Sequence, residues 1–456
     1  MTESVTAQGG LDGLRGVVAG EVLADGDAGL AEAARVVTAE GRPRVVVRCA
    51  GAGDVVAALR YAEAEDLPIA VRSGGHHAAG FGTRDGGVVI DVRPMDEVRL
   101  LPDNVVRVGT GATWGQVAAR LAKVGLAISA GDTAAVGVGG LMAGGGIGWM
   151  VRKHGLAIDN VVAAEVVTAD GAVRRVDSAT EPELFWGLRG AAGSLGVVTS
   201  YDITAVPQKT VHFGTLLYPW TEAEQVLEKW AEYMSDAPAE LTSSLQLAPT
   251  MMADRQVPVA VAVCATGDRA VLEPLRNLGS LLTDKVVETP YAEVFSDMSM
   301  PPGIRPRIRN GFYDEWTPNL GRRLLAARPR IPGLAMEIRA LGGAYGAMPA
   351  DATAFGHRDA RFLVNSVLMG PSEQADDFDD LWTSLRPKGA YLNFLSHPTD
   401  DDLDLCYPKA HRARLATLKQ SVDPGHVFRN TVSVPPRPEW TGGRRHLMRW
   451  AMRSRR

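Results

Sequence analysis

The chain has few cysteines, few aromatic residues and no excess of positive charge. Its 456 residues include three cysteines, and 6% of them are aromatic. Cys49, Cys264 and Cys406 lie far apart. This spacing fits neither a zinc site nor a disulfide framework, and it predicts buried, reduced thiols. The formal net charge of -5 provides no global basic field, so the composition does not favour nucleic acid as a partner.

Long apolar runs are also missing. No uninterrupted apolar stretch approaches the length of a membrane span, and residues 1–10 lack the pattern of a signal peptide. We therefore expect a cytoplasmic protein with no membrane span. The hydrophobic content of 46% is sufficient for a large core distributed over two or three domains.

A glycine-histidine turn is the most informative short segment. A β-type apolar run at 67–71 ends in Arg72-Ser-Gly-Gly-His-His77. Gly74 and Gly75 permit positive φ and close backbone approach, so successive N–H groups can converge on an anion such as a pyrophosphate. A histidine after such a turn lies beside whatever the loop holds. For this segment alone, a tight turn with solvated histidines is the alternative.

A second glycine-rich segment spans 131–148. It carries glycine at 137, 139, 140, 144, 145, 146 and 148. The pattern predicts backbone that lies flat against a large planar or phosphorylated ligand, with a glycine-rich helix contact as the alternative. No Gly-x-Gly-x-x-Gly opens a helix after a strand here, and no Gly-Lys-Ser/Thr follows, so Rossmann and Walker loops are excluded.

The periodicity along the chain predicts an α+β mixture rather than strict βα alternation. Asp54 is expected to be the N-cap of one helix, and Thr221 with Glu224 a capping box of another whose core stripe includes Trp230. Strands are expected at 43–49, 67–71, 88–92, 105–109, 242–247, 257–264, 335–340 and 362–368. Helices are expected at 11–22, 114–124, 183–189, 272–281 and 412–421.

Taken together, several motifs resemble a known family. The His76 loop, the 137–148 segment, Asp159-Asn160, Leu184-Phe-Trp and Gly196-Val-Val-Thr occur in the order and spacing of berberine bridge enzyme-like FAD-linked oxidases. That family has the vanillyl-alcohol oxidase, or PCMH, type of FAD domain. The resemblance implies an FAD-binding domain of two α+β subdomains at 1–205 and a substrate domain, an antiparallel sheet backed by helices, at 206–405. It also implies a segment returning to the FAD domain at 406–436, followed by a basic tail at 437–456.

The same resemblance implies covalent FAD, with the flavin 8α-methyl bonded to His76 and the pyrophosphate on the turn before it. Bicovalent members carry a cysteine where this chain has Thr133 and a histidine where it has Leu141, so a single histidyl bond is expected, as in the 6-hydroxy-D-nicotine oxidase-like subgroup. An alkylated imidazole raises the flavin potential and helps hydride acceptance. The residues expected to bind FAD are Arg72, Ser73, Gly74, Gly75, His76, His77, Gly80, Thr133, Gly137, Val138, Gly140, Gly144, Gly145, Gly148, Val198 and Asn393.

Three residues are expected to shape the substrate pocket: Tyr391, Asn393 and Asn365. Tyr391-Leu-Asn-Phe394 resembles a Tyr-x-Asn-Tyr segment whose second tyrosine helps to deprotonate alcohols, but Phe394 cannot take a proton. This favours an amine-like substrate, or recruitment of Tyr391, His77 or a water as base. Asn365 is the polar interruption on one face of its strand, with an ordinary strand-edge asparagine as the alternative.

The resulting hypothesis is an FAD-dependent oxidase, of a kind used in secondary metabolism. It would transfer hydride from a small amine-like or alcohol substrate to flavin N5, and O2 would reoxidise the flavin to give H2O2. The alternatives are a dehydrogenase of the same fold with another electron acceptor, a flavin scaffold for a non-redox cyclisation, and a binding protein for another phosphorylated ligand. No metal is expected. Arg305, Arg307 and Arg309 are expected to form a solvated face rather than a site for an acidic substrate.

Overall fold

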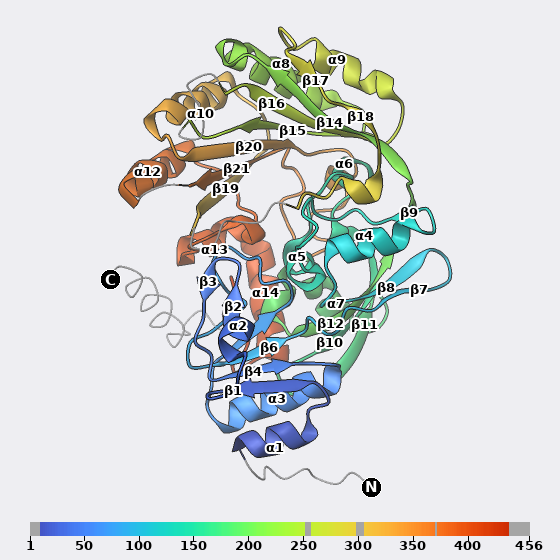
Figure 1. Ribbon diagram of the computed structural model, residues 1–456, viewed down its shortest axis with the longest axis vertical. Coiled ribbons are helices and arrows are strands. Elements are labelled where there is room, and N and C mark those ends of the chain that lie inside the picture. Colours follow the sequence, from blue (N-terminus) through green and yellow to red (C-terminus); the bar gives the residue numbers. More distant parts are fainter. Residues whose placement is uncertain (1–9, 251–256, 298–304, 370–371, 437–456) are drawn as a thin grey trace.

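The protein consists of two stacked parts. The computed structural model describes residues 10–250, 257–297, 305–369 and 372–436. In Figure 1 the N-terminal chain forms the lower part together with helices α13 (Asp400–Cys406) and α14 (Lys409–Val422), and a broad sheet with helices on its outer side forms the upper part. The helices α13 and α14 thus lie with the first part (Figure 1). The basic tail at 437–456 lies outside the described residues.

The first subdomain is a small mixed sheet. Its strand order is β1 (Glu21–Ala24), β4 (Val45–Arg48), β6 (Val88–Asp91) and β5 (Ile69–Arg72), and β6 runs parallel to both β4 and β5. Helix α3 (Ala52–Ala64) connects β4 to β5 and buries Val55, Ala58 and Leu59. Three smaller elements complete it: α1 (Gly10–Val17), α2 (Leu30–Ala34) and the hairpin of β2 (Arg35–Val36) and β3 (Ala39–Glu40).

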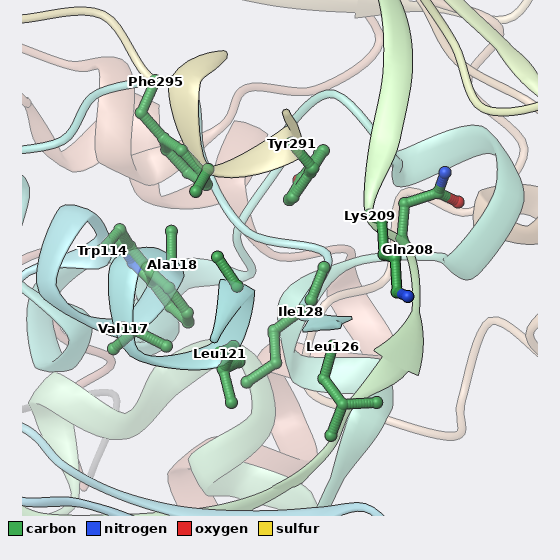
Figure 2. Close-up of a pocket in the computed structure, with 13 residues that line it drawn as sticks. Trp114, Val117, Ala118, Leu121, Leu126, Ile128, Gln208, Lys209, Tyr291 and Phe295 are labelled. Carbon is green, nitrogen blue, oxygen red and sulfur yellow. The ribbon is translucent and has the colours of Figure 1, made fainter. Parts of the chain in front are cut away.

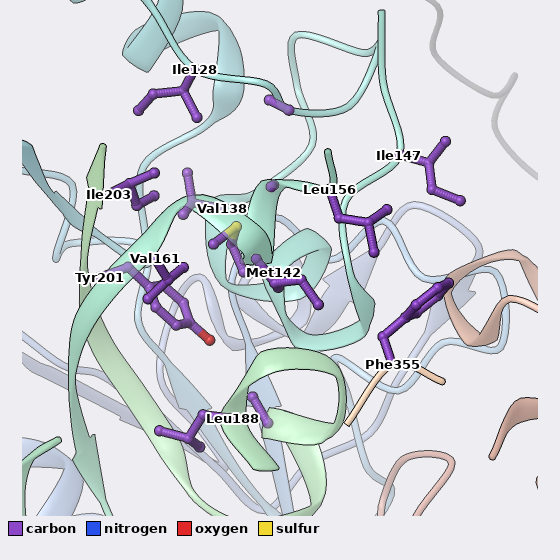
Figure 3. Close-up of a cluster of buried hydrophobic side chains, with 14 of the residues drawn as sticks. Ile128, Val138, Met142, Ile147, Leu156, Val161, Leu188, Tyr201, Ile203 and Phe355 are labelled. Atoms are coloured by element: carbon purple, nitrogen blue, oxygen red, sulfur yellow. The ribbon is translucent and has the colours of Figure 1, made fainter. Parts of the chain in front are cut away.

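The second subdomain is a five-stranded antiparallel sheet. Its order is β11 (Val173–Asp177), β10 (Val161–Val167), β12 (Val197–Thr204), β8 (Val105–Gly109) and β7 (Val98–Leu100). Its helices are α4 (Trp114–Ala122), α5 (Val138–Gly144), α6 (Val151–His154), η1 (Ala157–Asn160), α7 (Pro182–Ala191) and η2 (Ala192–Ser194), and β9 (Leu126–Ala127) pairs with β13 (Val206–Pro207). Val138 and Met142 of α5 belong to the buried cluster that contains Tyr201 and Ile203 of β12 (Figure 3). The apolar side of the glycine-rich helix is therefore core.

The upper part is an eight-stranded sheet. Its main order is β17 (Thr283–Asp284), β14 (Thr210–Tyr218), β16 (Val259–Ala265), β15 (Leu241–Leu247), β20 (Leu334–Ala340), β21 (Phe362–Leu368) and β19 (Arg307–Tyr313), and β18 (Val287–Pro290) also pairs with β14. Helices α8 (Ala223–Asp236), α10 (Pro318–Arg330) and α12 (Ala375–Leu385) cover its outer face (Figure 1). Alternation along the strands turns the opposite face toward α5 and α6. The remaining elements are η3 (Trp220–Glu222), η5 (Arg269–Leu272), α9 (Glu273–Arg276), η6 (Tyr291–Glu293), α11 (Ala344–Ala347), η7 (Ser372–Gln374) and η8 (Leu392–Phe394).

Most predicted strands are confirmed within one or two residues, and the fold is α+β as expected. Two capping predictions are wrong. Asp54 lies inside α3, and its carboxylate accepts N–H groups from Ala19, Gly20 and Ala50. Thr221 lies inside η3 (Trp220–Glu222), so α8 begins at Ala223 with Glu222 as its N-cap and without a side-chain cap. The Asp54 carboxylate is used by a neighbouring segment, and the predicted Thr221–Glu224 box is displaced by the η3 turn, neither of which local sequence reveals.

Two predicted helices are shorter than expected. The helix predicted at 11–22 ends at Val17, because β1 begins at Glu21 and pairs with β4. The helix predicted at 272–281 is reduced to η5 and α9, which ends at Arg276. The buried stripe of α8 is confirmed, and Trp230 is fully buried.

Candidate functional site

The glycine-histidine turn directly follows β5, and the buried side chain of Arg72 anchors its N-terminal end. Arg72, the last residue of β5, forms a buried ion pair with Asp91 of β6 (2.6 Å) and donates to the carbonyl groups of Ala33 and Arg35. Its guanidinium is 1% exposed. Arg72 therefore holds the base of the turn, and only its backbone is left to contact a ligand in the loop.

The turn and the N-terminus of α5 form a cradle of bare backbone. A Cβ on Gly74 would lie 2.5 Å from the Gly137 backbone nitrogen, so neither segment has room for a side chain there. Ser73 Oγ donates to the Thr110 carbonyl oxygen at 2.7 Å, which ties the turn to the end of β8. Within the described residues, the N–H groups of Gly74, Gly75 and His76 donate to no protein acceptor. Adjacent N–H groups left in this way are suited to an anion such as a pyrophosphate.

The two histidines differ in their bonds. His77 Nδ1 accepts the Ala79 N–H (3.2 Å), so Nε2 carries the proton and donates to the Leu392 carbonyl oxygen (3.1 Å). Burial lowers the pKa of His77 to about 4, although the bond to Leu392 opposes this shift. Burial also lowers the pKa of His76, whose ring has one hydrogen bond, to the Ala135 carbonyl. Both imidazoles are thus neutral at pH 7, and His76 alone keeps a ring nitrogen available.

The rest of the 131–148 segment has several roles. Gly145 and Gly146 have φ of 141° and 87°, which favours glycine. A Cβ on Gly140 would meet no atom within 4 Å, whereas Gly144 is packed against Asn393 and Gly148 against the Ala130 carbonyl. Gly140 therefore opens onto free space, and Gly144 and Gly148 serve contacts inside the protein.

The other residues expected at the FAD site lie around this cradle. Gly137 is the N-cap of α5, and Val138 is fully buried beneath it. Val198 is buried on β12 and accepts a hydrogen bond from Thr110 Oγ1 through its carbonyl. Gly80 has φ of 72° and donates to the His77 carbonyl. Thr133 Oγ1 bonds to Asp132 (3.0 Å) and lies 3.4 Å from Ser296 Oγ.

The turn around η8 contacts the cradle from the other part of the chain. Tyr391 is 2% exposed, and its hydroxyl oxygen accepts the Gly146 N–H and Asn393 Nδ2, both at 2.9 Å. Asn393 Nδ2 also lies 3.0 Å from the Leu141 carbonyl. Burial raises the pKa of Tyr391 to about 12, so the phenol stays protonated at pH 7. Tyr391 and Asn393 therefore fix the backbone of residues 141–146, which we call the glycine-rich wall.

One residue of this network was missed by sequence reasoning. Asn310 of β19 accepts the Tyr391 N–H (2.6 Å) and donates to the carbonyl groups of Tyr391 and Phe394, both at 3.0 Å. Its strand was not predicted, so nothing in the sequence placed it near Tyr391. A signal exists only in retrospect: it is a buried amide within an otherwise β-type run.

The inner face of the upper sheet presents a polar row. Gln246, Glu337, Asn365 and Asn310 are register partners across β15, β20, β21 and β19, so they point to the same side. Within the described residues, Asn365 Oδ1 is buried without a hydrogen-bond partner. The structure therefore places Asn365 on the face predicted for it, with an acceptor still to be satisfied.

A charged cluster lies beside this row and was also missed. Arg339 forms ion pairs with Glu337 (2.8 Å) and with Asp132, which precedes Thr133, and its guanidinium lies 5.4 Å from the Phe394 ring centroid. Burial alone lowers the pKa of Arg339, but the two carboxylates raise it above its ordinary value. The available signal was the alternation within β20, which places both charged residues on one face.

The arginines near 305 do not form a free cationic patch. Arg307 pairs with Asp379, and Arg309 pairs with Asp402 at 2.9 Å. Arg305 is exposed. Two of the three arginines are half-buried and ion-paired rather than solvated as expected, and this gives no support to an acidic substrate.

A separate small cavity lies between α4 and η6 (Figure 2). Its lining is mostly apolar and includes Trp114, Leu121, Tyr291 and Phe295. The Trp114 N–H donates to the Val136 carbonyl at 3.0 Å, so this helix supports the 134–136 segment. None of the residues predicted to bind FAD lines the cavity.

The described part of the chain lacks both a metal-binding cluster and a membrane-spanning helix. No group of three or more His, Cys, Asp or Glu side chains there could hold a metal ion. No helix there is both long enough and apolar enough to cross a membrane.

Comparisons with known proteins agree with this geometry. Residues 43–177 match a family model described as an FAD binding domain. The chain is 30% identical over 420 residues to the uncharacterised FAD-linked oxidoreductase YgaK of Bacillus subtilis, covering 86% of this chain and 91% of that protein. It is 28% identical to (R)-6-hydroxynicotine oxidase of Paenarthrobacter nicotinovorans, covering 92% and 97%.

Solved structures show the same fold over nearly the whole chain. The structure of 6-hydroxy-D-nicotine oxidase from Arthrobacter nicotinovorans has a TM-score of 0.82 at 26% identity, covering 92% of this chain and 98% of that chain. The BBE-like 1 protein of Physcomitrella patens has a TM-score of 0.83 at 19% identity, covering 93% and 98%. The described backbone cradle also suits the pyrophosphate of FAD. This chain is therefore an enzyme of the berberine bridge enzyme-like family of FAD-linked oxidoreductases.

Proposed function

We propose that the protein is an oxidase of small amine-type substrates that carries FAD on a single covalent bond to His76. The bound flavin would supply hydride acceptance at N5 and pass the two electrons to O2, giving H2O2. The observation that carries the proposal is an acidic cluster at the inner sheet face, where Glu337 of β20 and Asp132 of the 131–148 segment share the Arg339 guanidinium.

The His76 assignment follows from the hydrogen bonds of the two histidines. Attachment to the flavin needs a neutral imidazole with a free nitrogen lone pair. Both nitrogens of His77 are engaged, by Ala79 and Leu392. His76 is neutral, and its bond to Ala135 occupies one nitrogen. His76 is therefore the better nucleophile of the pair.

A second attachment is not expected. At the position of the second link in bicovalent relatives stands Thr133, whose hydroxyl bonds to Asp132. An alcohol is a far weaker nucleophile than a thiolate at pH 7. This supports the single histidyl bond.

The negative charge of the cluster around Arg339 supports an amine-type substrate. Arg339, Glu337 and Asp132 carry a combined formal charge of -1, which attracts a protonated amine. The unpaired Asn365 Oδ1 on the same face accepts a hydrogen bond from an N–H or O–H group. Phe394 provides no proton acceptor, and the Tyr391 hydroxyl is directed into the glycine wall. An amine suits this site because its ammonium form can release its proton to solvent water, after which the nitrogen lone pair assists hydride loss without a positioned base.

The test begins with the purified protein and its His76→Ala variant. Flavin fluorescence that remains with the wild-type polypeptide in a denaturing gel, and is absent from His76→Ala, is the expected result. Covalent flavin that persists in the variant would refute the assignment of His76.

Substrate class is tested by anaerobic flavin bleaching with panels of secondary amines and alcohols, followed by peroxide measurement in air. We expect bleaching by amines and about one H2O2 per substrate oxidised, as the proposed two-electron chemistry requires. Bleaching by alcohols alone would refute the amine proposal. Bleaching without peroxide would identify a dehydrogenase.

A further inference from the structure

The turn at 391–394 is the meeting point of three segments far apart in sequence. Tyr391 and Asn393 bond to the glycine-rich wall, through Gly146 and Leu141. Asn310 binds the turn from the edge strand of the upper sheet. His77 binds it from the glycine-histidine turn. Each of these links uses a polar group that is at least partly buried, where water competes poorly.

Asn310 determines the shape of the turn. It is 3% exposed, and its amide group makes three hydrogen bonds to the backbone of Tyr391 and Phe394. The Asn310 side chain bonds to the N–H and carbonyl of Tyr391 and to the carbonyl of Phe394, and so fixes both ends of the 391–394 segment. Phe394 is thereby kept against Arg339, beside the polar row.

His77 determines where the 391–394 turn lies relative to the glycine-histidine turn, which we call the flavin loop because it carries the proposed attachment site. Its ring packs at a tilt against Phe81 (4.6 Å between centroids, 37° between planes), and it accepts from the Ala79 N–H while donating to the Leu392 carbonyl. Because His76 directly precedes His77 in the chain, movement of the 391–394 turn is transmitted through His77 to the backbone that carries the proposed attachment site.

We propose that His77 and Asn310 are a pair of positioning residues that couple the flavin loop to the substrate-facing sheet through the 391–394 turn. His77 acts as a fixed neutral donor–acceptor and takes no part in proton transfer to substrate. The flavin-attachment readout rests on the proposed covalent bond to His76. The coupling itself does not.

Two substitutions of His77 separate hydrogen bonding from packing. His77→Gln retains one acceptor and one donor, whereas His77→Phe retains an aromatic ring beside Phe81 but loses both bonds. The first readout is the rate of covalent FAD incorporation into apo-protein, measured by in-gel fluorescence. We expect His77→Phe to be slowed about tenfold, because the 391–394 turn loses its one hydrogen bond from His77, and His77→Gln to stay within about twofold of wild type.

The second readout is hydrogen exchange of the peptide covering 388–396 in apo-protein. It should be faster in His77→Phe and in Asn310→Asp, which loses both donors, and close to wild type in His77→Gln. This measurement needs no covalent flavin. If FAD proves to be non-covalent while exchange responds as expected, the coupling stands and only the proposed attachment fails.

The proposed coupling of His77 and Asn310 is tested by combining His77→Phe with Asn310→Asp in a double variant. Because both residues act on one turn, the combined effect on exchange should be smaller than the product of the single effects. Ser243→Ala is the control, since it removes a buried hydroxyl bonded to Trp230 and Ala262 on the outer side of the sheet. It should change neither readout. Independent effects in the double variant, or a His77→Phe variant equal to wild type in both readouts, would overturn the inference.

Discussion

Substitution of Gly74 by alanine tests the FAD cradle directly. The added Cβ would lie 2.5 Å from the Gly137 nitrogen and 3.2 Å from the Ala135 carbonyl oxygen, where ordinary contact begins at 3.4 Å. The turn and the start of α5 must therefore separate by about 0.9 Å. Neither neighbour is a flexible side chain that could rotate away.

This separation should cost the cradle its anion contacts. Hydrogen bonds from N–H groups to a charged acceptor are each worth about 1.5–3 kcal/mol. Loss of one such bond lowers FAD affinity about 10- to 150-fold, by the relation of 1.4 kcal/mol to a factor of ten. The assay is titration of apo-protein with FAD in the His76→Ala background, where binding stays reversible, followed by flavin fluorescence.

The matched control is Gly53→Ala. Gly53 lies in α3, its Cβ would meet nothing within 4 Å, and alanine favours a helix. This variant should bind FAD as wild type does and be slightly more stable. If Gly74→Ala binds FAD as tightly as Gly53→Ala, the cradle is not where the pyrophosphate lies.

Three further predictions follow from single contacts. Glu337→Gln should raise KM for amines about tenfold with little change in kcat, because a charge-assisted hydrogen bond becomes a neutral one; an unchanged KM in steady-state assays would contradict this. Arg358→Met should lower the free energy of unfolding by about 3–5 kcal/mol in urea titrations, because it leaves Asp159 buried without its partner at 2.6 Å; a loss below about 1 kcal/mol would show that Asp159 is solvated. Acidification from pH 6.5 to pH 4 should lower the free energy of unfolding by about 1.4 kcal/mol per pH unit through His77. In this range the unfolded chain binds a proton at His77, whereas the folded protein, in which the pKa of His77 is about 4, does not. In thermal unfolding, His77→Gln should reduce this dependence on pH.

The proposed cofactor loop could be inferred from the sequence because its chemistry is local. Gly74, Gly75 and His76 are consecutive, so their converging N–H groups follow from short-range backbone geometry. The same holds for the alternation that places Asn365 on one face of its strand. Strand periodicity fixes a face without reference to any other segment.

The partners across the site were not predictable in this way. Arg339 meets Asp132, and Asn310 meets Tyr391, across separations of 207 and 81 residues. Composition and periodicity are the same whether or not such pairs form. The role of Tyr391 changed for the same reason. As a sequence motif it is a candidate base, whereas in the fold its hydroxyl is bonded to Gly146.

The sequence alone thus determined the family, the α+β class and the loop expected to hold FAD, because these depend on short motifs and on periodicity along single strands and helices. Only the tertiary structure decided which histidine keeps a free nitrogen, which carboxylates pair with Arg339 and which side chains fix the 391–394 turn. Those properties depend on burial and on hydrogen bonds between distant segments, and such contacts exist only after the sheets have packed.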